Sequence, residues 1–493
     1  MSLLLYLANG RVLPSNDAKA NAYAPLNLLG TGEVVFAPTD MPYMFGWRID
    51  RGDLVLLADW RAKPPGEEST YAELLAAGRL LPASYGLYLV PTLRTRAGTG
   101  EALFANTFGP AAGLTALPAA LVAFPLLGLQ VDHASIWLLA KITAALLVAG
   151  SVALVYLSAA RFTTPHRAAL LAAAYAFGTC VWSISSQTLW QQTPALFFYA
   201  LGILCVVRGG AQWGAAAGAA LALAMACRPT GALVLAAAAI YLLLTERRAF
   251  AAFVAASLPI VAALAFYNWY YFGAPWSFGQ LAMAQHLAET KTGSPEAWQT
   301  PLWLGAAGLL LSPSRGLLIH SPFLLLAFAG AVLAWRRPQY RALRFVAAAS
   351  VLLWIPAFLW FDWWGGWTYG YRPIVDTAPM LALLCLPVLD RVLDQRPARL
   401  AFAALLAWSV LVQVVGVFAY TPLAWNGRVL GDGTRADIDL PEHRHRLWSF
   451  RDWQIGFFIV NFPRAVAVGR AYAADWVTGP HNATGPDNLS LGK

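Results

Sequence analysis

Long apolar runs alternate with short basic or aromatic loops over most of the chain. A helix needs about 20 predominantly apolar residues to cross the hydrocarbon core of a membrane, and from residue 134 onward about ten such runs follow one another. The pattern therefore predicts an all-α polytopic membrane protein with about 10–11 transmembrane helices. The expected membrane helices cover residues 134–158, 167–185, 190–207, 212–226, 229–245, 250–271, 316–335, 343–361, 374–394 and 400–420.

Arginine residues mark every second connection between these runs. They are Arg161 and Arg167, Arg208, Arg247 and Arg248, Arg336, Arg337, Arg341 and Arg344, and Arg391, Arg396 and Arg399. Cytoplasmic loops carry an excess of Lys and Arg, so these connections are expected in the cytoplasm. The alternate connections, the residues before the first run and the tail after the last run are then expected outside.

This alternation divides the chain into four parts. They are a partial first membrane helix over residues 1–13, an outer segment over 14–133, the transmembrane bundle over 134–420 and an outer tail over 421–493. Residues 71–91 and 111–129 of the outer segment are expected to form short helices on the outer leaflet, because a spanning 111–129 would turn every basic loop outward. The apolar start is too short to span about 30 Å, so we expect the chain to begin inside a first membrane helix, with a half-span as the alternative.

Composition and charge narrow the class of protein further. Charged residues make up 12% of the 493 residues, whereas soluble domains average roughly a quarter, so a water-soluble enzyme is excluded. The net charge of +9 is explained by the basic loops, and no nucleic-acid partner is predicted. The four cysteines lie in apolar stretches without pairable spacing, and no glycine-rich nucleotide-binding motif occurs. We therefore predict no disulfide framework, no metal site and no cofactor.

The first polar cluster that could carry chemistry follows directly after the apolar start. It contains Ser15, Asn16 and Asp17. A carboxylate at the membrane surface beside a helix end can act as a general base toward a hydroxyl acceptor. The alternative interpretation of Asp17 is a solvated loop residue or a helix cap.

A polar break interrupts the apolar residues near 311–322, where Ser-Pro-Ser precedes Arg315 and where His320 follows. Non-helical backbone at membrane depth is tolerated where it lines a cavity or is buried in protein, so the break suggests a re-entrant element. Arg315 and His320 could hold an anionic headgroup, whereas the alternative for Arg315 is a side chain that snorkels to the interface.

An aromatic stretch over residues 361–373 contains Trp364, Trp367 and Tyr369 and leads through Arg372 to Asp376. Aromatic faces pack on sugar rings, and the arginine fork suits phosphate, so the stretch could bind a phosphorylated sugar. The alternative is an interfacial aromatic belt with a local ion pair between Arg372 and Asp376.

Two further outer turns offer polar groups. Arg228 lies between two predicted helices within reach of lipid phosphates, although it could equally be a plain turn residue. Residues 185–192 include Gln187 and Gln192, whose amides could bind sugar hydroxyls or could simply cap the two flanking helices.

Taken together, these stretches resemble the bacterial integral-membrane glycosyltransferases of the GT-C superfamily, related to the family 39 protein mannosyltransferases and the aminoarabinose transferases. The resemblance implies a GT-C-like bundle with a large first outer loop, in the bacterial cytoplasmic (inner) membrane, with the loop and the tail outside. The matching stretches run in order along nearly the whole chain: 15–17 with 25–29, 185–192, 228–230, 272–279, 311–322, 363–379 and 448–455.

The resemblance also implies an activity. It is the transfer of a sugar, with inversion, from a polyprenyl-phosphate-linked donor to an acceptor on the outer face of the membrane. Asp17 occupies the place of the base, in the first outer loop. Arg228, Arg315 and Arg372 are expected to bind the donor phosphate, because that leaving group needs fixed cations as its charge develops. The donor and membrane lipids are the expected partners, and no metal is required.

Two departures from the family pattern keep other hypotheses open. Relatives often carry a Tyr-Pro-Pro-Gly-like stretch and a His after Leu-Trp-Gln, whereas this chain has residues 107–110 (Thr-Phe-Gly-Pro) and Gln192. With the short first helix, these departures fit a non-catalytic GT-C-fold subunit whose partners are other membrane subunits. A transporter is a third hypothesis, but it would be expected to show inverted repeats and paired broken helices.

Overall fold

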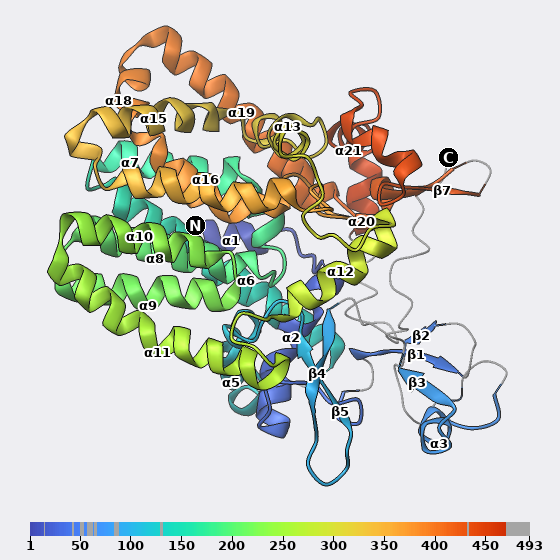
Figure 1. Ribbon diagram of the computed structural model, residues 1–493. Helices are drawn as coiled ribbons and strands as arrows, with labels where there is room; N and C mark the ends of the chain where they lie inside the picture. The colour runs from blue at the N-terminus through green and yellow to red at the C-terminus, as the bar shows by residue number, and fades with distance from the viewer. Residues whose placement is uncertain are drawn as a thin grey trace.

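The computed structural model is a bundle of long helices, and most of the strands and short helices gather at one end of it (Figure 1). The structure describes residues 1–13, 15–41, 44–49, 54–56, 63, 67–82, 88–128, 132–430 and 433–469. The expected tail is therefore described only as far as Gly469.

The bundle is built from helices that follow one another along the chain. They are α6 (His133–Ala159), α7 (Pro165–Gly178), α8 (Gln192–Arg208), α9 (Ala211–Cys227), α10 (Gly231–Thr245), α11 (Arg247–Phe272), α13 (Leu302–Leu311), α15 (Leu325–Arg336), α16 (Leu343–Leu359), α17 (Ala378–Leu384), α18 (Leu386–Asp394) and α19 (Arg396–Ala419). Short helical turns join some of them: η3 (Val181–Ser185), α14 (Leu317–His320), η4 (Pro322–Leu324), η5 (Pro338–Tyr340) and η6 (Arg372–Thr377).

Within the described residues, α6, α11 and α19 are each long and apolar enough to cross a membrane. The segment of η6 and α17 meets the same length and composition criteria only together with α18, from which it is bent by 56°, as in a broken span or a re-entrant loop. Shorter apolar helices of 10–17 residues, such as α8, α9 and α16, complete the bundle. The prediction of an all-α multi-pass membrane protein is confirmed, and each expected span coincides with one helix or with consecutive helical segments. Helix α13 was not predicted.

Small residues let helix backbones in the bundle touch. Gly214 and Gly218 on α9 face α11, where an added Cβ atom would lie 2.4 Å from the Ala249 carbonyl oxygen and 2.1 Å from that of Phe253, respectively. Small residues four apart are the usual means of close helix approach in membranes. A larger side chain at either glycine would force α9 and α11 apart.

The N-terminal segment contains small antiparallel sheets. One has the strand order β2-β1-β3, from β1 (Gly46–Ile49), β2 (Leu54–Leu56) and β3 (Leu80–Pro82). The other is a hairpin of β4 (Leu89–Thr95) and β5 (Ala102–Asn106).

The expectation of short helices over residues 71–91 holds for α3 (Tyr71–Ala76) and is wrong for residues 80–82 and 89–91, whereas residues 83–87 lie outside the described part of the chain. Leu81 pairs with Arg48 and Val90 pairs with Ala105, so strand pairing with residues distant in sequence replaces the helix. Short helices do form after residue 110: α4 (Ala111–Leu114), α5 (Leu117–Leu121) and η2 (Val122–Leu126).

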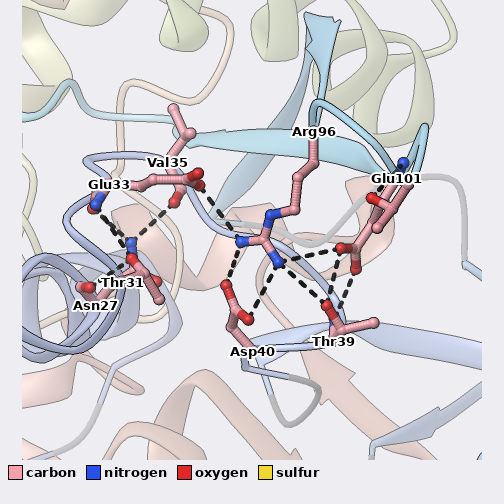
Figure 2. Close-up of polar contacts among 9 residues, drawn as sticks. Asn27, Thr31, Glu33, Val35, Thr39, Asp40, Arg96 and Glu101 are labelled. Carbon is pink, nitrogen blue, oxygen red and sulfur yellow. Dashed lines mark hydrogen bonds and ion pairs between the residues drawn. The ribbon is translucent and has the colours of Figure 1, made fainter.

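A group of carboxylates around a single arginine, Arg96, ties the segment after α2 (Asn16–Thr31) to the β4–β5 hairpin (Figure 2). Arg96 forms ion pairs with Asp40, with Glu33 (3.4 Å) and with Glu101 (3.4 Å). On α2, Asn27 donates a hydrogen bond to the Glu33 carbonyl oxygen (2.7 Å). The cluster fixes the orientation of α2, whose first turn carries Asp17.

The tail folds back on the same end of the bundle, beside α12 (Gly279–Thr292) (Figure 1). Arg446 holds it together, because its guanidinium donates to the Ala436 (2.6 Å) and Trp425 (2.9 Å) carbonyl oxygens and to the Asp452 carboxylate (2.8 Å). The tail elements are α20 (Pro422–Asn426), β6 (Gly427–Val429), β7 (Arg435–Asp437), η7 (Pro441–Trp448) and α21 (Gln454–Val460).

Candidate functional site

Asp17 lies in the first turn of α2, and 34% of its side-chain surface is exposed. One turn farther along, Asn21 donates a hydrogen bond to the Leu189 carbonyl oxygen (2.9 Å) and accepts one from Asn106 (2.7 Å). These bonds fix α2 between the β4–β5 hairpin and the loop that precedes α8. Asp17 is thereby brought to the end of the bundle.

Arg372 binds Asp17 directly. Its Nη1 lies 2.6 Å from the Asp17 Oδ2, and its Nη2 donates to the Gly365 carbonyl oxygen (2.6 Å). The guanidinium also lies over the ring of Trp190, with its Cζ 4.4 Å from the ring centroid. One face and two nitrogens of Arg372 are thus used, and its buried Nε has no hydrogen-bond partner among the described residues.

Arg228 binds the opposite end of η6, the turn that begins at Arg372. Its Nη1 lies 2.5 Å from the Asp376 Oδ2, and its Nη2 donates to the Pro373 carbonyl oxygen (2.8 Å). Arg372, Pro373 and Asp376 all belong to η6, the turn that leads into α17. The alternative of a local pair between Arg372 and Asp376 is wrong. In a helix with three residues per turn, positions four apart point about 120° away from each other, and each residue finds a distant partner instead.

The two ion pairs give the site a balanced charge. Arg228 and Arg372 supply two cations, and Asp17 and Asp376 supply two carboxylates. Guanidinium groups offer a planar fork of donors that binds carboxylate and phosphate alike. A phosphate that reached η6 could therefore take the place of a carboxylate on either arginine.

Two glycines shape the loop before η6. Gly365 (φ 73°) and Gly366 (φ 66°) both adopt the left-handed backbone conformation that favours glycine. Their carbonyl oxygens accept hydrogen bonds from Arg372 (2.6 Å) and from Arg315 (3.3 Å), respectively. The glycine pair thus turns consecutive carbonyl groups toward two arginines.

The predicted aromatic residues of this loop are engaged with other parts of the protein. The indole nitrogens of Trp364 and Trp367 donate to the carboxylates of Asp439 (2.9 Å) and Asp437 (2.8 Å) in the tail. Tyr369 is fully buried, and its hydroxyl donates to a carbonyl oxygen of α19 (2.8 Å). Their positions support packing of the tail on the loop. None of the three aromatic side chains contacts Asp17 in the described part of the chain.

Arg315 holds the loop and the tail together from inside the protein. Its guanidinium is fully buried and donates to the carbonyl oxygens of Trp364 (3.0 Å) and Ser314 (2.9 Å) and to the side chains of Gln454 (2.8 Å) and Asn426 (2.8 Å). With the bond to Gly366, all five N–H donors are used. The predicted phosphate-binding and snorkelling roles are therefore both wrong for this conformation, and the arginine is a structural cross-link.

His320 also lies inside the bundle. Its Nδ1 lies 2.9 Å from the Gly316 carbonyl oxygen, and its ring meets the edge of Tyr369 at a centroid distance of 5.4 Å. Because the imidazole is fully buried, it cannot contact a lipid headgroup, and the predicted headgroup role is not supported.

The two predicted glutamines differ in their surroundings. The Gln187 Oε1 accepts hydrogen bonds from Asn9 (2.7 Å) and from Lys141 (3.2 Å), and its amide nitrogen donates to the Trp182 carbonyl oxygen (2.8 Å). Gln187 thus binds the residues that directly follow the first helix, α1 (Ser2–Leu7). Gln192 is buried at the start of α8, and its Oε1 has no partner among the described residues.

Trp190 is a site residue that was not singled out from the sequence. It supplies the aromatic face on which Arg372 rests. The available signal was its place between two polar clusters at the start of a helix, in the same stretch as Gln192.

A second charged cluster joins α12 to the loop and the tail. The Lys291 Nζ lies 2.7 Å from Asp362 and 3.0 Å from Asp439. Burial lowers the pKa of Lys291, but the two carboxylates outweigh burial and raise the pKa above its ordinary value. Burial and the adjacent Asp362 raise the pKa of Asp439. One ammonium between two carboxylates leaves one negative charge uncompensated. Together with burial, this charge raises the pKa of Asp439.

Across the part of the chain that the structure describes, no group of three or more His, Cys, Asp or Glu side chains is arranged to hold a metal ion. All four cysteines are buried and unpaired there.

No family model matches the chain, and no curated protein matches it in sequence. Among solved structures, the chain is similar to ArnT from Cupriavidus metallidurans bound to undecaprenyl phosphate. The identity is 12%, the TM-score is 0.51, and the match covers 97% of this chain and 70% of that chain. The apo state of the same protein matches at 11% identity with a TM-score of 0.48, over 96% of this chain and 70% of that one. The likeness concerns the fold, and the chain has the GT-C-like fold that the resemblance implied.

Proposed function

We propose that this protein transfers a sugar, with inversion, from a polyprenyl-phosphate-linked donor to an acceptor on the outer face of the bacterial cytoplasmic membrane. The observation that supports the proposal most strongly is the contact between Asp17 and Arg372 on η6. In this contact, the carboxylate that we propose as the base lies beside a cation suited to a phosphate leaving group. The similar ArnT structure holds undecaprenyl phosphate, which is a lipid of the class that the proposal requires.

The orientation of the chain is part of the proposal. Arg228 lies between α9 and α10, whereas Arg208 and Arg247 lie at the opposite ends of these two helices. If the basic loops are cytoplasmic, η6 and Asp17 face outward. A lipid-linked donor would then meet the site at the membrane interface, where its phosphate resides.

The reaction proceeds by exchange at Arg372. The donor phosphate binds the Arg372 guanidinium in place of Asp17, and the released carboxylate accepts the proton of the acceptor hydroxyl. The acceptor oxygen bonds to the anomeric carbon from the face opposite the phosphate, and the bond between that carbon and the phosphate oxygen breaks. The electron pair leaves with the polyprenyl phosphate, whose growing charge is met by Arg372.

Transfer from radiolabelled polyprenyl-phosphate sugars, in membranes with equal amounts of each variant, tests the proposal. The wild type is expected to transfer, and Asp17→Asn is expected to lose about 100-fold or more, since a general base contributes roughly 10²–10⁴-fold. Asp394→Asn is the matched control, because Asp394 is also paired with an arginine, Arg167, but belongs to the opposite end of the bundle.

Absence of transfer by the wild type from every donor, with stoichiometric copurification of other membrane proteins, would instead identify a non-catalytic subunit. Transfer by Asp17→Asn at the wild-type rate would remove Asp17 from the mechanism and leave the fold without an assigned base.

A further inference from the structure

Several buried side-chain polar atoms that lack a hydrogen-bond partner among the described residues belong to η6 or to elements near it in the fold, of which η3 and α8 contact η6 directly. Nine such atoms lie on η3, in the loop between η3 and α8, on α8 itself, in the turn after Arg228 and on η6. They belong to Trp182, Ser185, Thr188, Gln191, Gln192, Tyr199, Thr230, Arg372 and Asp376. Buried polar groups in native proteins are almost always satisfied by protein, water or ligand. Several unsatisfied atoms on neighbouring elements therefore indicate that a polar group, either water or a ligand, binds between them.

Two of these residues share one face of α8. Gln192 and Tyr199 are seven residues apart, which corresponds to about two turns, so both point the same way. Helix α8 packs against η6. The Tyr199 hydroxyl is fully buried and lies within electrostatic range of Asp376 and Arg228.

On η6, only one of the two carboxylate oxygens of Asp376 has a partner among the described residues. Its Oδ2 binds Arg228, whereas its buried Oδ1 has no partner among the described residues. Thr230 follows Arg228 in the turn between α9 and α10 and adds a buried hydroxyl that is also unpartnered. Four side-chain oxygen atoms, on α8, in the turn before α10 and on η6, thus have no hydrogen-bond partner among the described residues.

The chemistry of these oxygens defines the ligand class. The Gln192 amide oxygen and the Asp376 carboxylate oxygen accept hydrogen bonds, and the Tyr199 and Thr230 hydroxyls both donate and accept. This mixture matches hydroxyl groups, which also donate and accept. Arg228 and Asp376 neutralise each other, so no net charge remains at this position for a charged substituent.

We propose that Gln192, Tyr199, Thr230 and Asp376, here called the hydroxyl-binding group, bind the ring hydroxyls of an uncharged sugar. The inference rests on the proposed function and adds to it the class of sugar that is transferred. The donor phosphate is then met by Arg372 and the sugar ring by the hydroxyl-binding group, so the two parts of one donor are recognised by separate residues on η6.

Binding of three lipids to the purified full-length protein in detergent tests this inference. The lipids are undecaprenyl phosphate, undecaprenyl-phosphate glucose and undecaprenyl-phosphate galacturonate. For the wild type, the glucose lipid is expected to bind more tightly than the other two. Tyr199→Phe and Gln192→Ala are each expected to weaken binding of the glucose lipid about 3- to 10-fold, as loss of one hydrogen bond does, and to leave undecaprenyl phosphate within about twofold.

Tyr267→Phe is the matched control, because Tyr267 also carries a buried hydroxyl without a described partner but belongs to α11. It should change the Kd of none of the three lipids. The thermal unfolding temperature of each variant reports whether its fold is retained.

Three results would overturn the inference. They are an unchanged Kd for the glucose lipid in both variants, an equal loss for all three lipids, and galacturonate binding as tight as glucose binding. The first would assign the unpartnered oxygens to buried water. If undecaprenyl phosphate binds the wild type while one of these results appears, only the inference fails; if no lipid binds, the proposed function fails with it.

Discussion

The Nη1 of Arg372 lies 2.6 Å from the Oδ2 of Asp17, a residue 355 positions earlier in the chain. The proposed base and the proposed phosphate-binding arginine are therefore paired with each other. In the proposed mechanism, binding of the donor phosphate to Arg372 releases Asp17 at the same step.

Asp17→Asn is predicted to bind undecaprenyl phosphate more tightly than the wild type, by about 3- to 10-fold, because a competing charge on Arg372 is removed. The Kd measured in detergent checks this, with Asp394→Asn as the control that should not change it. A weaker or unchanged Kd in Asp17→Asn would show that Arg372 does not exchange its partner.

Arg228→Met is predicted to destabilise the protein by about 3–5 kcal/mol, because it leaves Asp376 charged and buried without its partner. Adding Asp376→Asn removes the stranded charge and should recover at least half of the loss. Denaturant unfolding of the single and double variants measures both values. Additive losses in the double variant would mean that the two side chains do not act as a pair.

Arg315→Lys is predicted to lower stability by about 2–4 kcal/mol although the charge is kept, since an ammonium cannot replace five fixed donors. The Kd for undecaprenyl phosphate should stay within about twofold, because all five N–H donors of Arg315 are bound to protein groups. Arg451→Lys, at an exposed position in the tail, should leave the unfolding temperature unchanged. A selective loss of lipid binding in Arg315→Lys would show instead that Arg315 takes part in phosphate binding.

Mild acid is predicted to stabilise the packing of α12 on the tail through Asp439. Its pKa is raised in the folded state, so its contribution to stability is complete below the ordinary aspartate pKa of about 3.9 and is lost as the pH rises through the raised value. The change in unfolding temperature from pH 7 to about pH 4, near the ordinary aspartate pKa, should therefore be more positive in the wild type than in Asp439→Asn. Asp394→Asn, at the exposed opposite end, should follow the wild type.

The membrane helices could be predicted because the bilayer imposes their length and apolar composition directly on the sequence. The strands could not, since β1 (Gly46–Ile49) pairs with β3 (Leu80–Pro82) across about 30 residues and neither strand has a strong periodic pattern of its own. Helix α13 was missed because its ten residues are too few to cross a bilayer.

In the site, the residue types could be predicted but their partners could not. Asp17, Arg228, Arg372 and Asp376 stood out as charged groups at predicted helix ends. Their pairing depends on where η6 lies in three dimensions, and the local pair that the spacing suggested does not form. Arg315 shows the same limit, because a Ser-Pro-Ser-Arg-Gly stretch between apolar residues fits a buried arginine and an interfacial one equally well.

The span between Asp17 and Arg372 also has a meaning for biosynthesis. At roughly 5–20 residues per second, a ribosome adds Arg372 about 20 to 70 seconds after it has added Asp17. During this time most of the bundle is inserted, and the N-terminal segment remains without its contact to η6. The candidate site is thus among the last parts of the protein to form, and a nascent chain released before η6 would contain Asp17 without Arg372, its ion-pair partner.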